Sequence, residues 1–350
     1  MKKILGIFRG FPGLGRVVSG VSLLETLQKD HNCEVEIITY LQGNEYLASK
    51  GLQGGYTISH ADYCSIGLLP TNKMGASIHC KVKSYNPDLV IIDGEPLILH
   101  SLRISNPTLK IVALMNPADV DNPQNDKEAM DYFNTLYQLS DLAIIHGLRT
   151  VEPQYSYNNY ISIKTILRTE ILGIRNNPSN NIYCVLGGGT VNAEQSFIDS
   201  TVKIAKLCKA TADYLPGYNM HIICSSSNIC NTICSGKGNV FIHREVMNAT
   251  DFYTDACLVI TRSGRNTLSE LAYLGIPTIS FISGCSYRQI EQKQNMEEMN
   301  SIGITTANLS DNPTEFAITC RFEIEKKHIS SQFEPGNQTA INSILDLLNS

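Results

Sequence analysis

Two arginines and a glutamate gather in the stretch of sequence from Ile260 to Leu271. A short apolar run ends at Ile260, a turn of small residues follows, and a helix is predicted to begin near Asn266. The N–H groups at the start of a helix favour anions, and Arg262 and Arg265 stand beside them. This turn is therefore a candidate site for a diphosphate.

Glu270 lies about one helical turn further on, on the same side of the predicted helix. A carboxylate in that place can accept hydrogen bonds from two ligand hydroxyls. The alternative is that Glu270 only complements the positive end of the helix dipole. Taken alone, the residue does not decide between these two interpretations.

Two glycine-rich turns are predicted, each between an apolar run and a helix, at residues 10–16 and 187–190. Glycines let a ligand or another backbone approach closely. The first turn lacks regular dinucleotide spacing, and Thr39-Tyr40 stands where a nicotinamide-binding protein carries an acidic residue. The second turn lacks the Gly-Lys-Ser/Thr ending of a P-loop. Each turn is a candidate ligand loop, and a tight turn without a ligand is the alternative.

These turns need strands to hold them, and the chain offers several short apolar runs. Some are continuous in valine and isoleucine, which is typical of parallel strands covered on both faces. Amphipathic segments such as 17–28 and 267–274 alternate with them, which predicts an α/β fold of doubly wound sheets. The predicted strands are 3–8, 34–39, 89–92, 110–114, 142–145, 182–186, 220–224, 239–242, 258–260 and 277–281.

The length of 350 residues corresponds to two domains at roughly 150 residues each. The polar, proline-containing segment 175–181 precedes a predicted strand and is the best linker candidate. Both halves open in the same way, with a strand, a glycine-rich turn and a helix. We expect two Rossmann-like domains facing each other across a cleft, residues 1–174 and 175–334, followed by a C-terminal helix within residues 335–350.

The composition excludes several classes of protein. A net charge of −5 argues against a nucleic-acid binder, which would normally be basic. No apolar run approaches the ~18 residues that span a bilayer, and Arg9 interrupts the apolar start, which therefore resembles a strand more than a signal peptide. The 11 cysteines are scattered without a Cys-x-x-Cys pair, which favours a reduced chain over a zinc site. We expect a soluble, cytoplasmic protein.

Several motifs of the second half occur together in one known family. They are the segment 261–271, the run Leu274-Gly275-Ile276-Pro277, and the spacing of Gln292, Asn295 and Gly303. In this combination they resemble the donor half of GT-B glycosyltransferases, most of all the family that contains the N-acetylglucosaminyltransferase of lipid II synthesis. Residues 167–172 resemble that family's segment before the domain linker. The first half matches only in outline, through the first glycine-rich turn and Asn116-Pro117.

The resemblance implies a site for a nucleoside-diphosphate sugar, with UDP as the expected nucleotide. Glycines and a helix start would meet the diphosphate, Glu270 would hold the ribose hydroxyls, and main chain near Val246 would pair with the base. Gln292, with Glu291, would hold the sugar hydroxyls, and the C-terminal helix would cross back onto the first domain. The implied donor-site residues are Arg168, Gly188, Gly189, Thr190, Val246, Arg262, Ser263, Gly264, Arg265, Asn266, Thr267, Glu270, Glu291 and Gln292.

One position departs from that family. Many members carry a histidine base in the first glycine-rich turn, and here that place is Arg16, which cannot act as a base near neutral pH. We expect Arg16 to bind an acidic group of the acceptor or the diphosphate of the donor. Asp93 and Glu95, after the predicted strand 89–92, are the candidate bases, and His100 is a further one. The alternative is that Arg16 only holds its loop and that the two carboxylates only cap the next helix.

The predicted function is transfer of a sugar from a nucleotide sugar to an acceptor on the first domain, with inversion and without a metal or other cofactor. The acceptor, whether a small molecule, a glycan or a lipid-linked compound, is not identified, and peripheral contact with a membrane stays open. A nucleotide-sugar hydrolase, a 2-epimerase and a non-catalytic binder are the alternatives. Asp119-Val120-Asp121 spells the metal-binding Asp-x-Asp of the other major glycosyltransferase fold, but such pairs are common in loops and no metal is expected there.

Overall fold

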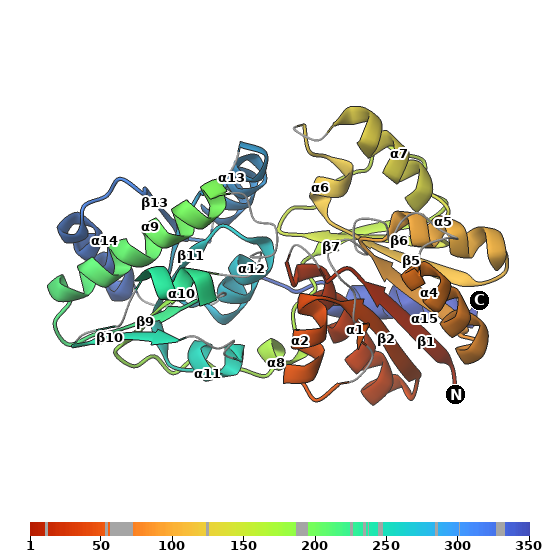
Figure 1. Cartoon of the computed structure of the whole chain (residues 1–350), viewed down its shortest axis with the longest axis horizontal. Helices are drawn as coiled ribbons and strands as arrows, with labels where there is room; N and C mark the ends of the chain where they lie inside the picture. Colours follow the sequence, from red (N-terminus) through yellow and green to blue (C-terminus); the bar gives the residue numbers. More distant parts are fainter. Residues whose placement is uncertain are drawn as a thin grey trace. The chain divides into compact units, whose positions relative to one another are not determined.

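The computed structural model divides the chain into two compact units (Figure 1). The first unit comprises Met1–Thr169 and Pro335–Ser350, and the second comprises Glu170–Glu334. The residues that the structure describes are 1–10, 13–52, 55–56, 73–123, 126–186, 195–224, 227–233, 236, 238–243, 248–283, 286–300, 302–326 and 333–350.

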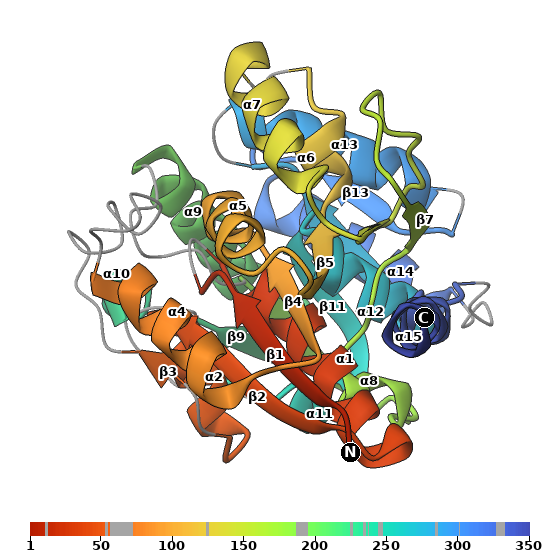
Figure 2. The ribbon, with the colours of Figure 1, turned by 90° about the vertical axis from the view of Figure 1, so that its right-hand side faces the viewer.

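The first unit is built on a sheet of seven parallel strands in the order β3-β2-β1-β4-β5-β6-β7 (Figure 2). The strand order reverses between β1 and β4, which are neighbours in the sheet. The strands are β1 (Lys3–Phe8), β2 (Glu34–Tyr40), β3 (Gly55–Tyr56), β4 (Leu89–Asp93), β5 (Lys110–Met115), β6 (Leu142–Gly147) and β7 (Tyr160–Lys164).

Helices cover both faces of this sheet. One face packs against α1 (Gly15–His31), α2 (Gln42–Ser49) and α15 (Asn337–Asn349). The other face packs against α4 (Lys73–Tyr85), α5 (Pro96–Ser105), α6 (Pro117–Val120) and α7 (Lys127–Tyr137). In β4, Leu89 and Ile91 pack on the α1 side, and Val90 and Ile92 pack on the α5 side. Because both faces are buried, Leu89–Ile92 form a continuous apolar run with no polar alternation.

The C-terminal helix α15 belongs to the first unit, although the whole second unit precedes it in the sequence. Its apolar residues Ala340, Ile341, Ile344 and Leu348 are buried in the same cluster as α1. At its start, the side chain of Asn337 accepts a hydrogen bond from the Leu167 N–H and donates one to the Leu167 carbonyl, both at 2.9 Å.

The second unit contains a sheet of six parallel strands in the order β10-β9-β8-β11-β12-β13. Its strands are β8 (Asn181–Val185), β9 (Asn219–Ile223), β10 (Val240–His243), β11 (Ala256–Arg262), β12 (Thr278–Phe281) and β13 (Thr305–Ala307). Its helices are α9 (Gln195–Thr211), α10 (Ser227–Ile233), α11 (Ala249–Tyr253), α12 (Arg265–Leu274), α13 (Ser286–Asn300) and α14 (Pro313–Glu325), and α8 (Thr169–Leu172) lies where the chain passes between the units.

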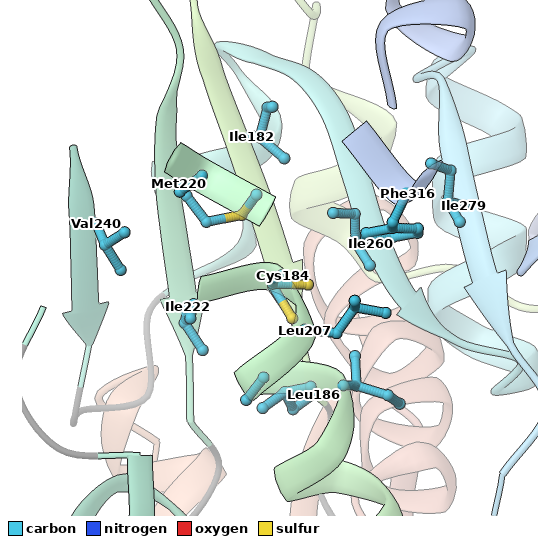
Figure 3. Close-up of a cluster of buried hydrophobic side chains, with 14 of the residues drawn as sticks. Ile182, Cys184, Leu186, Leu207, Met220, Ile222, Val240, Ile260, Ile279 and Phe316 are labelled. Carbon is cyan, nitrogen blue, oxygen red and sulfur yellow. The ribbon is translucent and has the colours of Figure 1, made fainter. Parts of the chain in front are cut away.

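One hydrophobic cluster fills the space between this second sheet and the helices α9, α10 and α14 (Figure 3). Strand residues such as Ile182, Ile222 and Ile260 meet Leu207 of α9 and Phe316 of α14 there. Cysteines fill gaps in the same core. The eight cysteines in the described ranges are all free thiols, and only Cys80 among them is exposed.

The predicted doubly wound α/β fold is confirmed, and each of the ten predicted strands overlaps an observed strand. Strands β3, β7 and β13 were not predicted. Each lies at an edge and pairs with only one neighbouring strand in these sheets. Within the part of the chain that the structure describes, no helix combines the length and the hydropathy needed to cross a bilayer.

Candidate functional site

The second sheet reverses its strand order between β8 and β11. Ligands of open α/β sheets bind outside the carboxyl ends of the strands at such a reversal. The turn predicted to bind a diphosphate starts where β11 ends, at Arg262, and the glycine-rich turn follows the neighbouring strand β8. Gly188, Gly189, Thr190 and Val246 lie outside the described residues, and their roles stay predictions.

The turn after β11 is held from two sides. The Ser263 hydroxyl lies 2.8 Å from the Ser280 hydroxyl, and the Ser263 N–H donates to the Phe281 carbonyl at 3.2 Å. The side chain of Asn295, on α13, donates to the Ser263 carbonyl at 3.1 Å. All three polar side chains are buried. The backbone of the turn is therefore positioned by β12 and α13 before any ligand arrives.

Helix α12 begins directly after this turn. Its N-cap is Gly264, which has no side chain to bond the first N–H groups of the helix. Those groups carry the positive end of the helix dipole, which favours an anion. Arg265 lies along this start, where its Nε donates to Asn266 Oδ1 at 3.0 Å. Glu270 follows in the second turn of α12 and is only 3% exposed.

Arg262 and Arg168 are the two other arginines predicted to contact the diphosphate. Arg262 Nη1 donates to the Thr201 hydroxyl on α9 at 3.2 Å, so its guanidinium is bonded within the unit. Arg168 falls in the first unit, just before the division of the chain. A contact of either arginine with a diphosphate stays a prediction.

Gln292 is bonded to the main chain of its own unit. Its side-chain oxygen accepts from the Ser283 N–H at 2.7 Å, and its nitrogen donates to the Ser283 carbonyl at 2.8 Å. These two bonds position the loop after β12, and they leave one N–H and one lone pair of the amide for a ligand. Glu291, partly buried, precedes it on α13. Binding of sugar hydroxyls by this pair stays a prediction.

In the first unit, the strand order reverses between β1 and β4. Arg16 lies in the first turn of α1, the helix that follows β1, and Asp93 is the last residue of β4. Arg16 Nη1 donates to Asp93 Oδ1, and Arg16 Nη2 donates to both carboxylate oxygens of Asp119 at 2.9 and 3.1 Å. A contact of Arg16 with an acidic acceptor group or with the diphosphate of the donor stays a prediction. The guanidinium lies between two carboxylates of its own chain, and these already neutralise its charge.

Glu95 belongs to a second ion pair beside the first. It is 3% exposed, accepts a hydrogen bond from the Tyr40 hydroxyl, and lies 3.4 Å from Arg9 Nε. Gly94 separates the two pairs and has φ +81°. An added Cβ there would lie 2.7 Å from Arg16 Cδ and 2.8 Å from Arg9 Cβ, so glycine lets both arginines pack against the turn. A role of Asp93 or Glu95 as a base stays a prediction.

Asp119 is the site residue that the sequence analysis missed. It follows β5, the neighbour of β4, and its Oδ2 accepts from the Asn116 N–H at 2.8 Å in a capping box that starts α6. Burial would raise the pKa of Asp119, but the charge and hydrogen bond of Arg16 outweigh it and lower that pKa. The signal in the sequence was Asn116-Pro117 with an aspartate two residues later, typical of a helix start.

The two carboxylates of the Asp-x-Asp segment do not converge on one site. Asp119 pairs with Arg16, whereas Asp121 Oδ2 accepts from Arg149 Nη1 at 2.6 Å. Among the residues that the structure describes, no group of three or more His, Cys, Asp or Glu side chains is arranged to hold a metal ion.

Comparison with known proteins places this geometry in a wider context. Residues 184–343 match the family model of the glycosyltransferase family 28 C-terminal domain, and no curated protein matches the chain closely in sequence. Similar solved structures include MurG of Acinetobacter baumannii, with 14% identity over 99% of this chain and 100% of that chain and a TM-score of 0.59. Glycosyltransferase VinC in complex with dTDP has 12% identity, 99% coverage of both chains and a TM-score of 0.61. The UDP-GlcNAc 2-epimerase of Neisseria meningitidis bound to UDP-GlcNAc has 13% identity, 99% coverage of both chains and a TM-score of 0.61.

Two doubly wound parallel sheets, matched over nearly the whole chain by these structures, define a GT-B fold. Within that fold, the chain resembles the glycosyltransferases of the MurG family, and residues 184–343 match the model of the family 28 C-terminal domain. The resemblance expected from the motifs is confirmed, and the domain supports a glycosyltransferase-type function.

Proposed function

We propose that the protein transfers a sugar from a UDP-sugar to a hydroxyl of an acceptor bound by its first unit. The reaction would invert the anomeric carbon, and the leaving diphosphate would be stabilised by N–H groups and guanidinium groups instead of a metal. The observation that carries the proposal is the turn after β11. It is held by Ser263 and Asn295, it opens onto an uncapped helix start, and it lies inside the segment that matches family 28.

The donor would lie at the reversal of the second sheet. In this assignment the diphosphate binds at the start of α12 and at the glycine-rich turn after β8. Glu270 accepts hydrogen bonds from the two ribose hydroxyls. The burial of Glu270 supports this role, because a carboxylate excluded from water gains most from ligand hydroxyls. Two proteins of the same fold hold dTDP and UDP-GlcNAc in their solved structures. The likeness to the MurG family favours UDP over dTDP.

The acceptor would lie at the reversal of the first sheet, where the carboxylates of Asp93, Glu95 and Asp119 gather. A carboxylate of this group would take the proton of the acceptor hydroxyl, since Arg16 cannot. Asp93 and Glu95 are the first candidate bases from the sequence, and His100 is the third. We also place the protein in the cytoplasm, because the free and mostly buried cysteines of the described ranges suit a reducing compartment.

The test is incubation with a panel of nucleotide sugars, with release of free nucleotide followed with and without sugar acceptors. The proposal predicts UDP release that depends on an acceptor and is strongest with a UDP-sugar. UDP release that is equal without an acceptor would identify a hydrolase. A new epimer formed without a glycosylated product would identify a 2-epimerase, an activity that one similar structure carries.

Removal of metal ions by a chelator distinguishes a diphosphate stabilised by N–H and guanidinium groups from one stabilised by a metal ion. We expect EDTA to leave turnover unchanged, because the donor turn offers a helix start and Arg265 where a metal site would need carboxylates. Loss of turnover in EDTA, with recovery on adding magnesium or manganese, would contradict the proposed stabilisation of the leaving group.

A further inference from the structure

The three carboxylates at the reversal of the first sheet differ in their access to solvent. The side chains of Asp93 and Glu95 are 0% and 4% exposed, whereas that of Asp119 is 23% exposed. A general base must come within about 2.6–3.2 Å of the group whose proton it removes. An acceptor can therefore approach Asp119 in the conformation that the structure shows, whereas Asp93 and Glu95 are covered by their own chain.

Asp119 also keeps a place for one more hydrogen bond. Its Oδ2 accepts from the Asn116 N–H at 2.8 Å and from Arg16 Nη2 at 3.1 Å, and its Oδ1 accepts from Arg16 Nη2 at 2.9 Å. A carboxylate offers about four lone-pair sites, two on each oxygen. The contacts between described residues fill both sites of Oδ2 and one site of Oδ1, so the second site of Oδ1 is left for an acceptor hydroxyl.

The surroundings of Asp119 give this oxygen a defined position. Helix α6 begins just after β5, and the capping box between Asn116 and Asp119 holds the carboxylate against its first turn. The Asn134 side chain donates to the Asp119 carbonyl at 2.9 Å and itself accepts from the Tyr157 hydroxyl. A base that is held in place before the acceptor arrives loses little freedom when the reaction takes place.

Arg16 keeps this carboxylate ionised. Burial alone would raise the pKa of Asp119, but the charge and the hydrogen bond of Arg16 lower it below its ordinary value of 3.8. Asp119 is therefore an anion throughout the neutral pH range. Such a carboxylate is a weak base toward a free alcohol, but a hydroxyl becomes strongly acidic once its oxygen begins to bond to the anomeric carbon. A weak base that is always ionised is then sufficient.

We propose that Asp119 is the catalytic base of the transfer. Its Oδ1 takes the proton as the O–H bond of the acceptor breaks and the acceptor oxygen bonds to the anomeric carbon. The bond from that carbon to the diphosphate breaks, its electron pair leaves with UDP, and the proton later passes from Asp119 to water. Arg16 is a positioning residue that orients Asp119. This inference rests on the proposed function, because it names the base for the same transfer.

The test is the pH dependence of kcat/KM in the full-length protein and in Asp119→Asn. UDP-glucose and UDP-GlcNAc serve as donors, and methyl glucoside, glycerol and phenol serve as acceptors. We expect Asp119→Asn to lower kcat at least about 100-fold at pH 7. Its kcat/KM should then rise roughly tenfold per pH unit from pH 7 to 9, because the acceptor must lose its proton without a base. The unaltered protein should show no such rise, since its carboxylate is already ionised.

Asp121→Asn is the matched control. It makes the same change of charge two residues away, on a carboxylate that pairs with Arg149 instead of Arg16. It should keep the rate and the pH profile of the unaltered protein. Melting temperatures and calorimetry with UDP show whether each variant is folded and binds the nucleotide. A folded Asp119→Asn variant with an unchanged rate would overturn the inference, and so would a loss that is equal at every pH, since a merely structural role does not alter the pH dependence.

The proposed function can fail separately from this inference. Asp93→Asn, Glu95→Gln and His100→Gln are measured beside Asp119→Asn for this purpose. If the unaltered protein forms no product from any of these donor and acceptor pairs, the transfer itself is contradicted, and the assignment of a base falls with it. If Asp119→Asn forms product as the unaltered protein does while one of the other three variants does not, the transfer stands and Asp119 is not its base.

Discussion

At the scale of single residues, Gly94 decides whether the Arg16 network can form. It is the residue between Asp93 and Glu95, its φ is +81°, and both Arg9 and Arg16 pack within 3 Å of where a Cβ would stand. Glycine meets both demands, since it tolerates positive φ and offers no side chain to collide with.

Gly94→Ala should lower the free energy of unfolding by more than the strain of a positive φ alone, because the added Cβ would also collide with Arg9 and Arg16. The matched control is Gly51→Ala, because Gly51 also has a positive φ, +68°, but an added Cβ there has no atom within 4 Å. We expect about 1–2 kcal/mol of lost unfolding free energy for the control and at least about 1 kcal/mol more for Gly94→Ala. Urea unfolding measures both. Equal losses in the two variants would show that Arg16 and Arg9 move aside without cost.

Residue types and positions alone predicted only part of this site. Asp93 and Glu95 were identifiable because they follow an apolar run, and Arg16 was identifiable because it stands where the resembled family carries a histidine. Asp119 was not, because its pairing with Arg16 joins residues 103 positions apart and depends on β5 lying next to β4. The same limit applies to Gln292, whose bonds to Ser283 depend on where α13 packs.

At the scale of elements, one face of the second sheet carries a row of aromatic rings. Tyr183 of β8 stacks on His221 of β9 at 4.7 Å between ring centroids, and His221 stacks on Phe241 of β10 at 4.9 Å. His221 Nδ1 also lies 2.9 Å from Nε2 of His243. Such a pair holds one shared proton when both rings are neutral, and the bond between them is lost when both facing nitrogens carry a proton.

Acid should therefore weaken this sheet. Burial lowers the pKa of both histidines from 6.5, and the neighbouring His243 adds to the effect on His221. At acidic pH the unfolded chain therefore binds more protons than the folded chain. The contribution of the two neutral histidines to the free energy of unfolding is fully present above pH 6.5, and it is lost as the pH falls through their lowered pKa values.

The corresponding variant is His243→Asn, which removes one partner of the pair. Melting temperatures from pH 7.5 to 5 should fall less steeply in the variant than in the unaltered protein, since one proton-binding difference is gone. A parallel fall in both would show that other groups cause the acid sensitivity.

The elements themselves were mostly predictable. Buried central strands such as β4 and β11 are apolar except at their carboxyl ends, and that signal is strong. Strand β7 was missed because it lies at an edge with mostly half-exposed or exposed residues, and β3 and β13 were missed because they have only two and three residues. Edges of a sheet are set by pairing with a neighbour more than by composition.

At the scale of the whole molecule, the first unit is completed by the last residues of the chain. Helix α15 buries Ala340, Ile341, Ile344 and Leu348 against the first sheet, and the Lys110 ammonium donates to the Leu347 carbonyl near its end at 2.8 Å. The first unit therefore reaches its full core only after the second unit has been synthesised.

Ile344→Ala tests how much α15 contributes. Ile344 is fully buried, and such truncations cost about 2–5 kcal/mol. Asp346→Ala lies on the exposed side of the same helix and should change stability by less than about 0.5 kcal/mol. Urea unfolding followed by circular dichroism compares the two variants. A loss below about 1 kcal/mol for Ile344→Ala would mean that α15 adds little to the first core.

The central claim is that the second unit binds the nucleotide of a nucleotide sugar through the start of α12 and Glu270. Isothermal calorimetry of UDP against the full-length protein, Glu270→Ala and the exposed α14 variant Glu325→Ala tests it most directly. We predict that Glu270→Ala weakens UDP binding by about 1.5–3 kcal/mol, roughly 10- to 150-fold, because hydrogen bonds to a charged group are lost. Glu325→Ala should bind as the unaltered protein does. A folded Glu270→Ala variant with unchanged affinity for UDP would contradict the account.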